Sequence, residues 1–315
     1  MSTRHLARSG RGAAWVAVLS LALGGCPIGN NKYAKPKDLS PSWRIDKLRV
    51  LAVRADPPEV LPGQTATFSA LVTDPNDEVG AVVWLACPPD DNGGVGLGCS
   101  IDPSFDFNNA TPDALLAAGF IGFEPFLAPT YTPPADLLDG LDEFQARDGE
   151  YVLVQIAVLP QSMLDAGFDG ADFDFNQLEA AYKRLVVSTE TQPNQNPSVS
   201  TLMVDGVNIP EGTVVQVDPG ETYTITPVLT EGSIEIYDYT DKNGLTTKRN
   251  EEPYFEWYAD GGAVTVSASL FPYLDGKWKA PLPEDDGPKS GTWWGVVRDR
   301  RGGMNWISRQ WAVRE

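Results

Sequence analysis

Hydrophobic and polar residues alternate along most of the chain after Leu48, with the two-residue period that is typical of β-strands. In "TATFSALV" the residues Ala66, Phe68 and Val72 fall on one face, and Leu71 is the only large apolar residue on the other face. Similar runs, separated by Pro, Gly, Asp and Asn, are "LRVLAV", "AVVWLAC", "YVLVQIAVL", "RLVVS", "TYTITPVLT", "YFEWYA", "AVTVSASLF", "WWGVV" and "WISRQWAV". Helical signals are confined to "TPDALLAAG" and "NQLEAAYKR". The pattern predicts an all-β sandwich fold with short helical insertions.

An internal repeat indicates that the sandwich occurs twice. The segment "PGQTATF" at Pro62–Phe68 matches "PGETYTI" at Pro219–Ile225, and each copy is followed by a tryptophan in a strand-like run, Trp84 or Trp257. Between the copies, "TETQPNQNPS" contains no apolar side chain other than two prolines, as is typical of a linker. We therefore expect a first sandwich domain at residues 44–192, a linker at 193–197 and a second sandwich domain at 198–315.

The first 25 residues have the pattern of a secretory signal, with three arginines ahead of an apolar run at Ala13–Leu23. This run is too short for a spanning helix, which needs about 20 apolar residues. The sequence "LGGC" resembles the lipobox of bacterial lipoproteins, which implies that Cys26 is diacylated and becomes the N-terminus. The alternative is ordinary secretory cleavage that leaves Cys26 as a free thiol. Residues 26–43 are polar and Pro-containing, and we expect them to form a flexible tether.

The charge of the chain excludes some classes of partner. It carries 43 Asp and Glu against 24 Lys and Arg, for a net charge of −19. Phosphate backbones bind clusters of Lys and Arg, so nucleic acid is a poor partner, and anionic lipid headgroups are repelled as well.

The single histidine, His5, falls in the predicted signal. The rest of the chain therefore lacks the imidazole of a Ser-His-Asp triad, a Cys-His site or a histidine-ligated zinc site. The remaining catalytic possibility is a carboxylate pair of the glycoside-hydrolase type among Glu252, Glu256 and Asp260. We expect a protein that is not an enzyme and that has no cofactor, apart from a possible Ca²⁺ ion.

Cys87 and Cys99 flank a turn rich in Asp and Gly. In an oxidising compartment such a pair normally closes a local disulfide, which we predict here. The alternative, a two-thiolate metal site, lacks further soft ligands.

Three stretches carry a resemblance to a known family, namely "LRVLAVRADPPEVLPGQTATFSALVTDP", "VVWLAC" and "VVRDRRGGMNW". They resemble myxobacterial-type predicted envelope lipoproteins with tandem immunoglobulin-like domains. The resemblance implies the two-sandwich architecture and an envelope location. The chain departs from antibody-type domains, because a Cys87–Cys99 bridge would leave out the inter-sheet disulfide of that pattern.

Two groups of residues are candidate binding sites. The first is an acidic loop with hard oxygen ligands of the kind that Ca²⁺ takes, although its spacing is not that of an EF-hand, and the residues are Asp165, Asp169, Asp172 and Asp174. A solvated turn that caps a following helix is the alternative explanation.

The second group is Trp293 and Trp294, which as neighbours on a strand must point to opposite faces, so that one indole lies outside the core. That indole would stack on a sugar or partner, or be covered by the preceding domain. The basic run Arg298–Gly303 is predicted to be a hairpin loop in which glycine supplies positive φ.

Together these patterns predict a non-catalytic, lipid-anchored envelope protein that presents two sandwiches to an envelope protein or a surface polysaccharide. Pro27 is not the aspartate that retains some lipoproteins at the inner membrane, which favours the outer membrane. The alternatives are a carbohydrate-binding lipoprotein that uses the Trp-rich second domain, and a carboxylate-dependent hydrolase.

Overall fold

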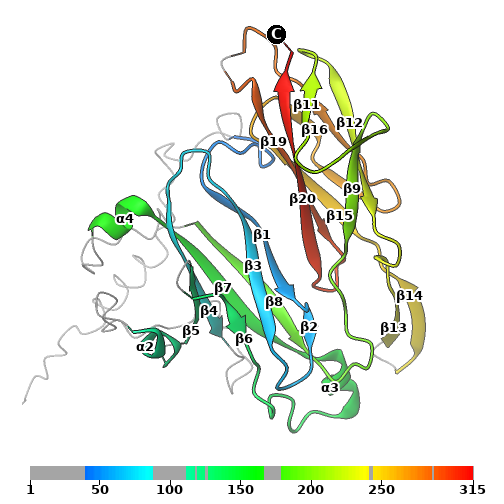
Figure 1. The fold of residues 1–315 in the computed structure, drawn as a ribbon. Coiled ribbons are helices and arrows are strands. Elements are labelled where there is room, and N and C mark those ends of the chain that lie inside the picture. The colour runs from blue at the N-terminus through cyan, green and yellow to red at the C-terminus, as the bar shows by residue number, and fades with distance from the viewer. Residues whose placement is uncertain are drawn as a thin grey trace, which may run out of the picture. The chain divides into compact units, whose positions relative to one another are not determined.

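The computed structural model describes residues 40–87, 111–117, 119–124, 127–166, 179–240, 244–285 and 287–314. Residues from Ser42 onward form one compact unit. In this unit the chain forms antiparallel strands joined by turns and by the short helices α2 (Pro112–Ala117), α3 (Glu143–Asp148) and α4 (Gln161–Ala166), as Figure 1 shows.

The first sandwich is built from two sheets. One sheet has the order β1-β3-β6, with bounds Arg49–Asp56, Ala66–Thr73 and Thr130–Tyr131. The facing sheet has the order β2-β8-β7-β4-β5, with bounds Glu59–Val60, Glu179–Val187, Glu150–Pro160, Val79–Cys87 and Phe120–Glu124. Neighbouring strands are antiparallel except β2 and β8, which are parallel.

The second sandwich repeats this plan. One sheet has the order β10-β9-β12-β18-β16, with bounds Val207–Ile209, Val199–Val204, Thr222–Leu229, Gly276–Lys279 and Ala263–Val266. The other has the order β11-β20-β19-β15-β17, with bounds Val214–Val217, Met304–Val313, Ser290–Arg298, Tyr254–Ala259 and Ala268–Leu270. A separate hairpin pairs β13 (Ile236–Thr240) with β14 (Thr246–Asn250).

Both sandwiches have the strand order of an immunoglobulin-like domain. The orders β1-β3-β6 and β9-β12-β18 correspond to strands A, B and E, and the orders β8-β7-β4 and β20-β19-β15 correspond to G, F and C. In each copy the Pro-Gly turn follows a short strand that pairs in parallel with the last strand, and Gly63 and Gly220 have φ of 79° and 73°. The predicted fold, two tandem immunoglobulin-like sandwiches with short helical insertions, is confirmed.

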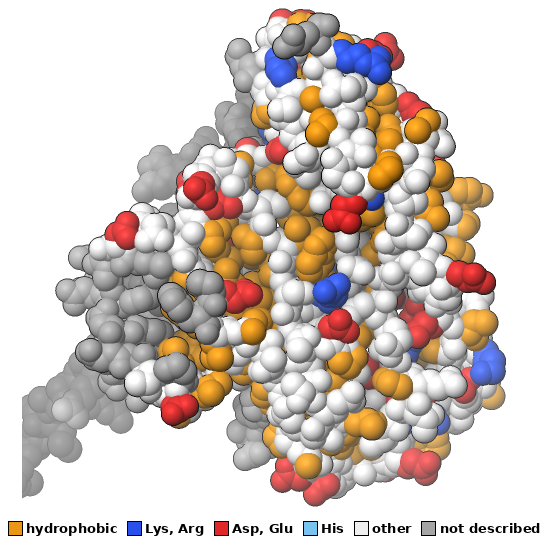
Figure 2. All heavy atoms as spheres, in the orientation of Figure 1, with side chains coloured by type: hydrophobic (Ala, Val, Ile, Leu, Met, Phe, Trp, Pro, Cys, Tyr) orange, Lys and Arg blue, Asp and Glu red, His pale blue; other side chains and the backbone are white. Residues whose placement is uncertain are grey.

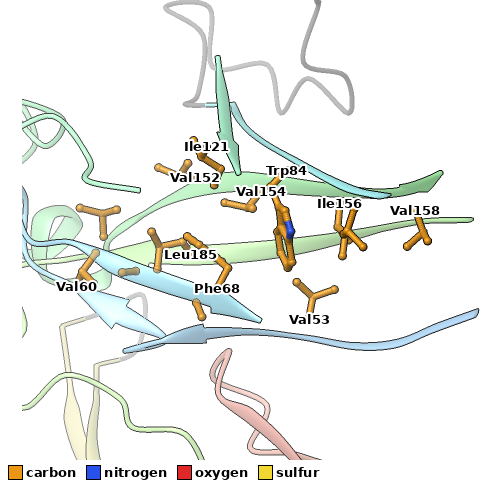
Figure 3. Close-up of a cluster of buried hydrophobic side chains, with 14 of the residues drawn as sticks. Val53, Val60, Phe68, Trp84, Ile121, Val152, Val154, Ile156, Val158 and Leu185 are labelled. Atoms are coloured by element: carbon orange, nitrogen blue, oxygen red, sulfur yellow. The ribbon is translucent and has the colours of Figure 1, made fainter. Parts of the chain in front are cut away.

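Aromatic side chains fill the cores. Trp84 on β4 is fully buried and lies 6.1 Å from Phe68 on β3, measured between ring centroids. Figure 3 shows the Trp84 ring between Val53 and Phe68 of one sheet and strands of the other. In the second core Trp278 contacts Trp293 and Trp311, each at 4.9 Å. The B and F strands of both domains contain no cysteine, so aromatic packing takes the place of the inter-sheet disulfide.

One detail of the local predictions is wrong. The segment "NQLEAAYKR" was expected to be helical, but the chain from Glu179 to Val187 is strand β8. Its Ala and Glu favour a helix, yet Lys183, Leu185 and Val187 alternate inward between β7 and β2, and this pairing outweighs intrinsic propensity. The run "AVTVSASLF" divides into β16 and β17, which belong to different sheets. The helix expected in "TPDALLAAG" is confirmed as α2.

The outer faces of the two sandwiches meet in an apolar contact, which we call the seam. Its buried members are Ile45, Leu51, Ala52 and Val296, and side chains packed against them are Leu71, Tyr258, Trp294, Met304 and Trp306. Figure 1 shows β1 beside β20, and these strands are in contact. The segment before β1 adds backbone hydrogen bonds to β15, from Ile45 N to Ala259 O and from Ala259 N to Trp43 O. Leu71, the apolar exception on its strand, therefore faces the second sandwich.

The connector at 193–197 has no helix or strand, but it is held by both sandwiches. Asn194 is 1% exposed. The Asn196 side chain donates to Ala55 O at 2.8 Å and accepts from Met304 N at 3.0 Å. The domain boundaries at 192 and 198 stay a prediction. In the described part of the chain, no helix combines the length and the apolar character that crossing a bilayer requires.

Replacing Leu51 with Ala should lower the free energy of unfolding by about 2–4 kcal/mol, because it opens a cavity in the seam. Leu116→Ala makes the same change at a side chain that is 51% exposed and should cost less than about 0.5 kcal/mol. Chemical denaturation of both variants measures the difference. Equal effects would show that the seam does not contribute to stability.

Candidate functional site

The loop between β19 and β20 is organised by one buried carboxylate. Asp299 is 1% exposed, and its Oδ1 accepts hydrogen bonds from the backbone nitrogens of Arg301 (2.7 Å), Gly302 (3.0 Å) and Gly303 (2.9 Å). Gly302 has φ of 116°, as expected for the predicted hairpin, and Arg300 also has positive φ, at 72°. A Cβ on Gly303 would collide with the Asp299 carboxylate and with Gln195 O, so only glycine fits there.

The same loop is attached to the first sandwich and to the connector. The other Asp299 oxygen accepts from Asn194 Nδ2 at 2.9 Å, and Lys183 of β8 donates to Gly302 O. Burial raises the pKa of Asp299, while hydrogen bonds from Asn194 and the loop and the charge of Lys183 lower it. Burial also lowers the pKa of Lys183 to about 8, partly offset by Asp299.

Arg301 lies at the centre of three carboxylates. Its guanidinium is 3.0 Å from Glu251, 3.3 Å from Glu235 and 3.8 Å from Glu59, and it stacks on Tyr237 at 4.3 Å from the ring centroid. Glu59 belongs to the first sandwich, whereas Glu235 and Glu251 flank the β13–β14 hairpin of the second. One side chain therefore links both sandwiches to the base of the hairpin.

The remaining contacts of this group, which we call the junction cluster, satisfy its carboxylates. Glu59 accepts from Ser188 Oγ at 2.5 Å and from Asn194 N at 2.7 Å. Glu251 accepts from Glu235 N at 3.0 Å. Burial raises the pKa of Glu251 to about 7, and the nearby negative charges of Asp299 and Glu235 raise it further. The hydrogen bond from Glu235 N and the positive charge of Arg301 lower it. Among the described residues, no three His, Cys, Asp or Glu side chains are arranged to hold a metal ion.

Two hollows adjoin the β13–β14 hairpin and share Tyr237 in their walls. The larger has a volume of about 470 Å³ and is lined by residues that include Arg249, Glu252 and Arg300. The smaller, of about 250 Å³, lies between the hairpin and residues Glu190–Gln192, which precede the connector. At the far end of the hairpin, Arg147 of α3 donates to Thr240 Oγ1 at 2.6 Å. The hairpin thus spans the boundary between the two sandwiches.

The tryptophans predicted as a ligand surface are not exposed. Trp293 is 1% exposed in the second core, and Trp294, on the opposite face of β19, packs in the seam. The outer indole is therefore covered by the preceding domain, which was the alternative explanation. The Trp293 ring is therefore closed to a sugar, whereas the Trp294 ring is only partly buried.

Most residues of the other predicted sites lie outside the described residues. These are Cys26, Cys99, Asp169, Asp172 and Asp174. Cys87 ends β4, and its pairing with Cys99 stays a prediction. Asp165 lies in α4 and accepts from Gln161 Nε2 at 2.7 Å, and the Ca²⁺ site likewise stays a prediction.

The three carboxylates considered for hydrolysis have separate partners. Glu256 pairs with Arg298, Glu252 lies 3.4 Å from Arg300, and Asp260 accepts from Thr292 N at 2.9 Å. Burial raises the pKa of Asp260.

Sequence reasoning identified the basic loop but missed its carboxylate partners. Glu59, Glu235 and Glu251 lie far from the loop along the chain, and no local pattern distinguishes them from the other acidic residues. The available signal was the density of arginine at Arg298–Arg301 in a strongly acidic chain.

Comparison with known proteins yields structures but no family. No family model matches the chain, and no curated protein matches it. Among solved structures, the N-terminal Ig1-2 module of the Drosophila receptor protein tyrosine phosphatase DLAR aligns with 85% of this chain and 100% of its own, at 11% identity and a TM-score of 0.24. Three N-terminal domains of the bacteriophage RB49 outer capsid protein Hoc align with 84% of this chain and 59% of theirs, at 11% identity and a TM-score of 0.20.

Dimeric latent PorU from Porphyromonas gingivalis aligns with 85% of this chain at 10% identity and a TM-score of 0.22, and the match spans 24% of that protein. With TM-scores this low, the description of the fold as immunoglobulin-like rests on the strand order given above.

Substituting Asp299 with Ala should lower the free energy of unfolding by about 2–4 kcal/mol, because it leaves three buried or half-buried backbone N–H groups and the buried Asn194 amide without their acceptor. Asp218→Ala is the matched control, since that carboxylate is half exposed and pairs only with Arg314, so its loss should cost less than about 1 kcal/mol. Urea unfolding of the two variants checks the comparison, and an Asp299→Ala protein as stable as the control would contradict the proposed role of the carboxylate.

The raised pKa of Glu251 makes stability depend on pH. Between the ordinary value of 4.5 and about 7, the folded protein keeps a proton that the unfolded chain releases, so stability falls as pH rises through this interval. Glu251→Gln should remove about 1–3 kcal/mol of that fall. Unfolding free energies of wild type and variant at pH 4.5, 6 and 7.5 measure it; parallel pH curves would be incompatible with the raised pKa.

Proposed function

We propose that this protein is a non-catalytic, lipid-anchored protein of the bacterial cell envelope that presents two joined sandwiches to a protein partner or a surface polysaccharide. The proposal rests on the contact between the two sandwiches, which consists of the seam and the junction cluster. The seam and the junction cluster hold connector, hairpin and both sandwiches together, as suits an ectodomain that positions a binding surface relative to its anchor. Immunoglobulin-like sandwiches serve widely as interaction modules, although a fold alone does not establish a function.

The proposed anchor is Cys26, on the strength of the "LGGC" sequence and the short apolar run ahead of it. A single acyl chain binds a membrane only marginally, whereas two chains on one cysteine give stable attachment. On the face shown in Figure 2, acidic side chains are scattered, and the Lys and Arg side chains lie singly or in a small group at the top of the view. The outer membrane is the proposed location because Pro27 follows the cysteine.

Replacing Cys26 with Ser, together with a cleavage site for ordinary signal peptidase, should release a folded protein into the soluble fraction, because attachment depends on the acyl chains. Cell fractionation with a salt wash measures this. Pro27→Asp is the control, since it keeps the cysteine and should stay membrane-bound while moving toward the inner membrane.

A Cys26→Ser protein that remained with the membrane after the salt wash would refute Cys26 as the sole anchor. Crosslinking in intact cells tests the second half of the proposal. Wild type should give a specific adduct with an envelope protein or polysaccharide, and the released variant should lose it.

A further inference from the structure

The two faces of the β13–β14 hairpin differ in chemistry. Tyr237 lies directly opposite Arg249 in the register, so both occupy one face, and Tyr239 shares that face two residues further along. The Arg249 guanidinium lies 3.4 Å from the centroid of the Tyr239 ring. Lys248, the neighbour of Arg249, projects to the other face and pairs with Asp238 at 3.2 Å. The hairpin therefore has one face of tyrosine and arginine and one with a self-contained ion pair.

The tyrosine–arginine face borders the larger hollow, with Arg300 of the β19–β20 loop also in its wall. The buried carboxylates in the wall are already occupied. Asp299 is bound by the loop amides and Asn194, and Glu251 by Arg301 and Glu235 N. Glu252 makes only an exposed contact of 3.4 Å with Arg300.

In the part of the chain that the structure describes, Arg249 has no carboxylate within ion-pair distance and is held by stacking alone. What the hollow offers a ligand is therefore the guanidinium groups of Arg249 and Arg300, the exposed carboxylate of Glu252, and the face of the Tyr237 ring that Arg301 does not cover. Guanidinium forks match the two oxygens of a carboxylate. A tyrosine ring supplies a flat apolar surface with a polar end, which suits the C–H face and hydroxyls of a sugar.

We propose that this hollow binds a carboxylate-bearing sugar unit of a surface polysaccharide, with Arg249 and Arg300 holding the carboxylate and Tyr237 contacting the ring. The inference rests on the proposed function and names the class of polymer that the second sandwich recognises. It assigns ligand binding to residues of the second sandwich other than Trp293 and Trp294.

The net charge of −19 works against long-range attraction of an acidic polymer. Binding must therefore come from these local contacts, and removing one arginine of the hollow should matter more than removing a nearby lysine.

The test is calorimetric titration of the purified full-length protein with oligogalacturonate, alongside its methyl ester as the uncharged counterpart. Wild type should bind the acid and bind the ester at least about tenfold more weakly. Arg249→Ala should weaken binding of the acid about tenfold, and Lys248→Ala, which removes the same charge from the opposite face of the same strand, should change it less than about twofold. Arg300→Asn is the second variant, because asparagine tolerates the positive φ at that position.

Circular dichroism and thermal unfolding establish that each variant is folded. The proposal is overturned if wild type binds neither oligosaccharide, if it binds acid and ester equally, or if Arg249→Ala and Lys248→Ala weaken binding by the same factor. Binding of poly-glutamate but not of the oligosaccharide would also overturn it, in favour of an acidic protein segment. An Arg249→Ala protein that kept its envelope location and crosslinked partner would show that the hollow is not the contact, while leaving the anchored interaction function intact.

Discussion

The arrangement of the two sandwiches depends on the burial of the β19–β20 loop against the connector and the first domain. Asp299 closes the loop on itself, and Arg301 extends from the closed loop to Glu59, Glu235 and Glu251. An arginine placed among three carboxylates is satisfied only when all the segments that bear them are in position. The interaction therefore specifies one relative placement of strand β2, the connector and the hairpin, which is the role for which buried polar groups are best attested.

The seam and the junction cluster contribute in different ways. The seam removes large apolar side chains from water and supplies the non-directional part of the contact. The junction cluster supplies direction, since each hydrogen bond requires its own geometry. Burial within this cluster raises the pKa of Glu251 to about 7 and lowers the pKa of Lys183 to about 8. Contacts between the domains are thus sensitive to pH near neutrality, whereas the aromatic cores are not.

The β13–β14 hairpin provides a surface for binding beside the contact between the two sandwiches. A two-stranded hairpin is marginally stable by itself in water, and here its base rests on Arg301 while its end rests on Arg147 of the first sandwich. With both ends supported, its tyrosine–arginine face lines the larger hollow, whose wall also contains Arg300. A binding surface on such a scaffold is preorganised and loses little conformational entropy when a ligand arrives.

Local pattern was enough to determine the fold class. Alternation in "TATFSALV", the repeated Pro-Gly turn and the tryptophan that follows each copy predicted two sandwiches, because strand period and turn chemistry are properties of neighbouring residues. The same reasoning located the hairpin loop at Arg298–Gly303. It failed for β8, where pairing with β7 and β2 outweighs helix propensity.

Leu71 and Trp294 stood out as apolar residues on polar faces, and only the tertiary structure showed that each faces the other sandwich. The partners of Arg301 lie about 50 to 240 residues away along the chain, and the burial that raises the pKa of Glu251 exists only once they meet. Sequence determined the strands and turns, and the contacts between distant surfaces decided which charges are buried together.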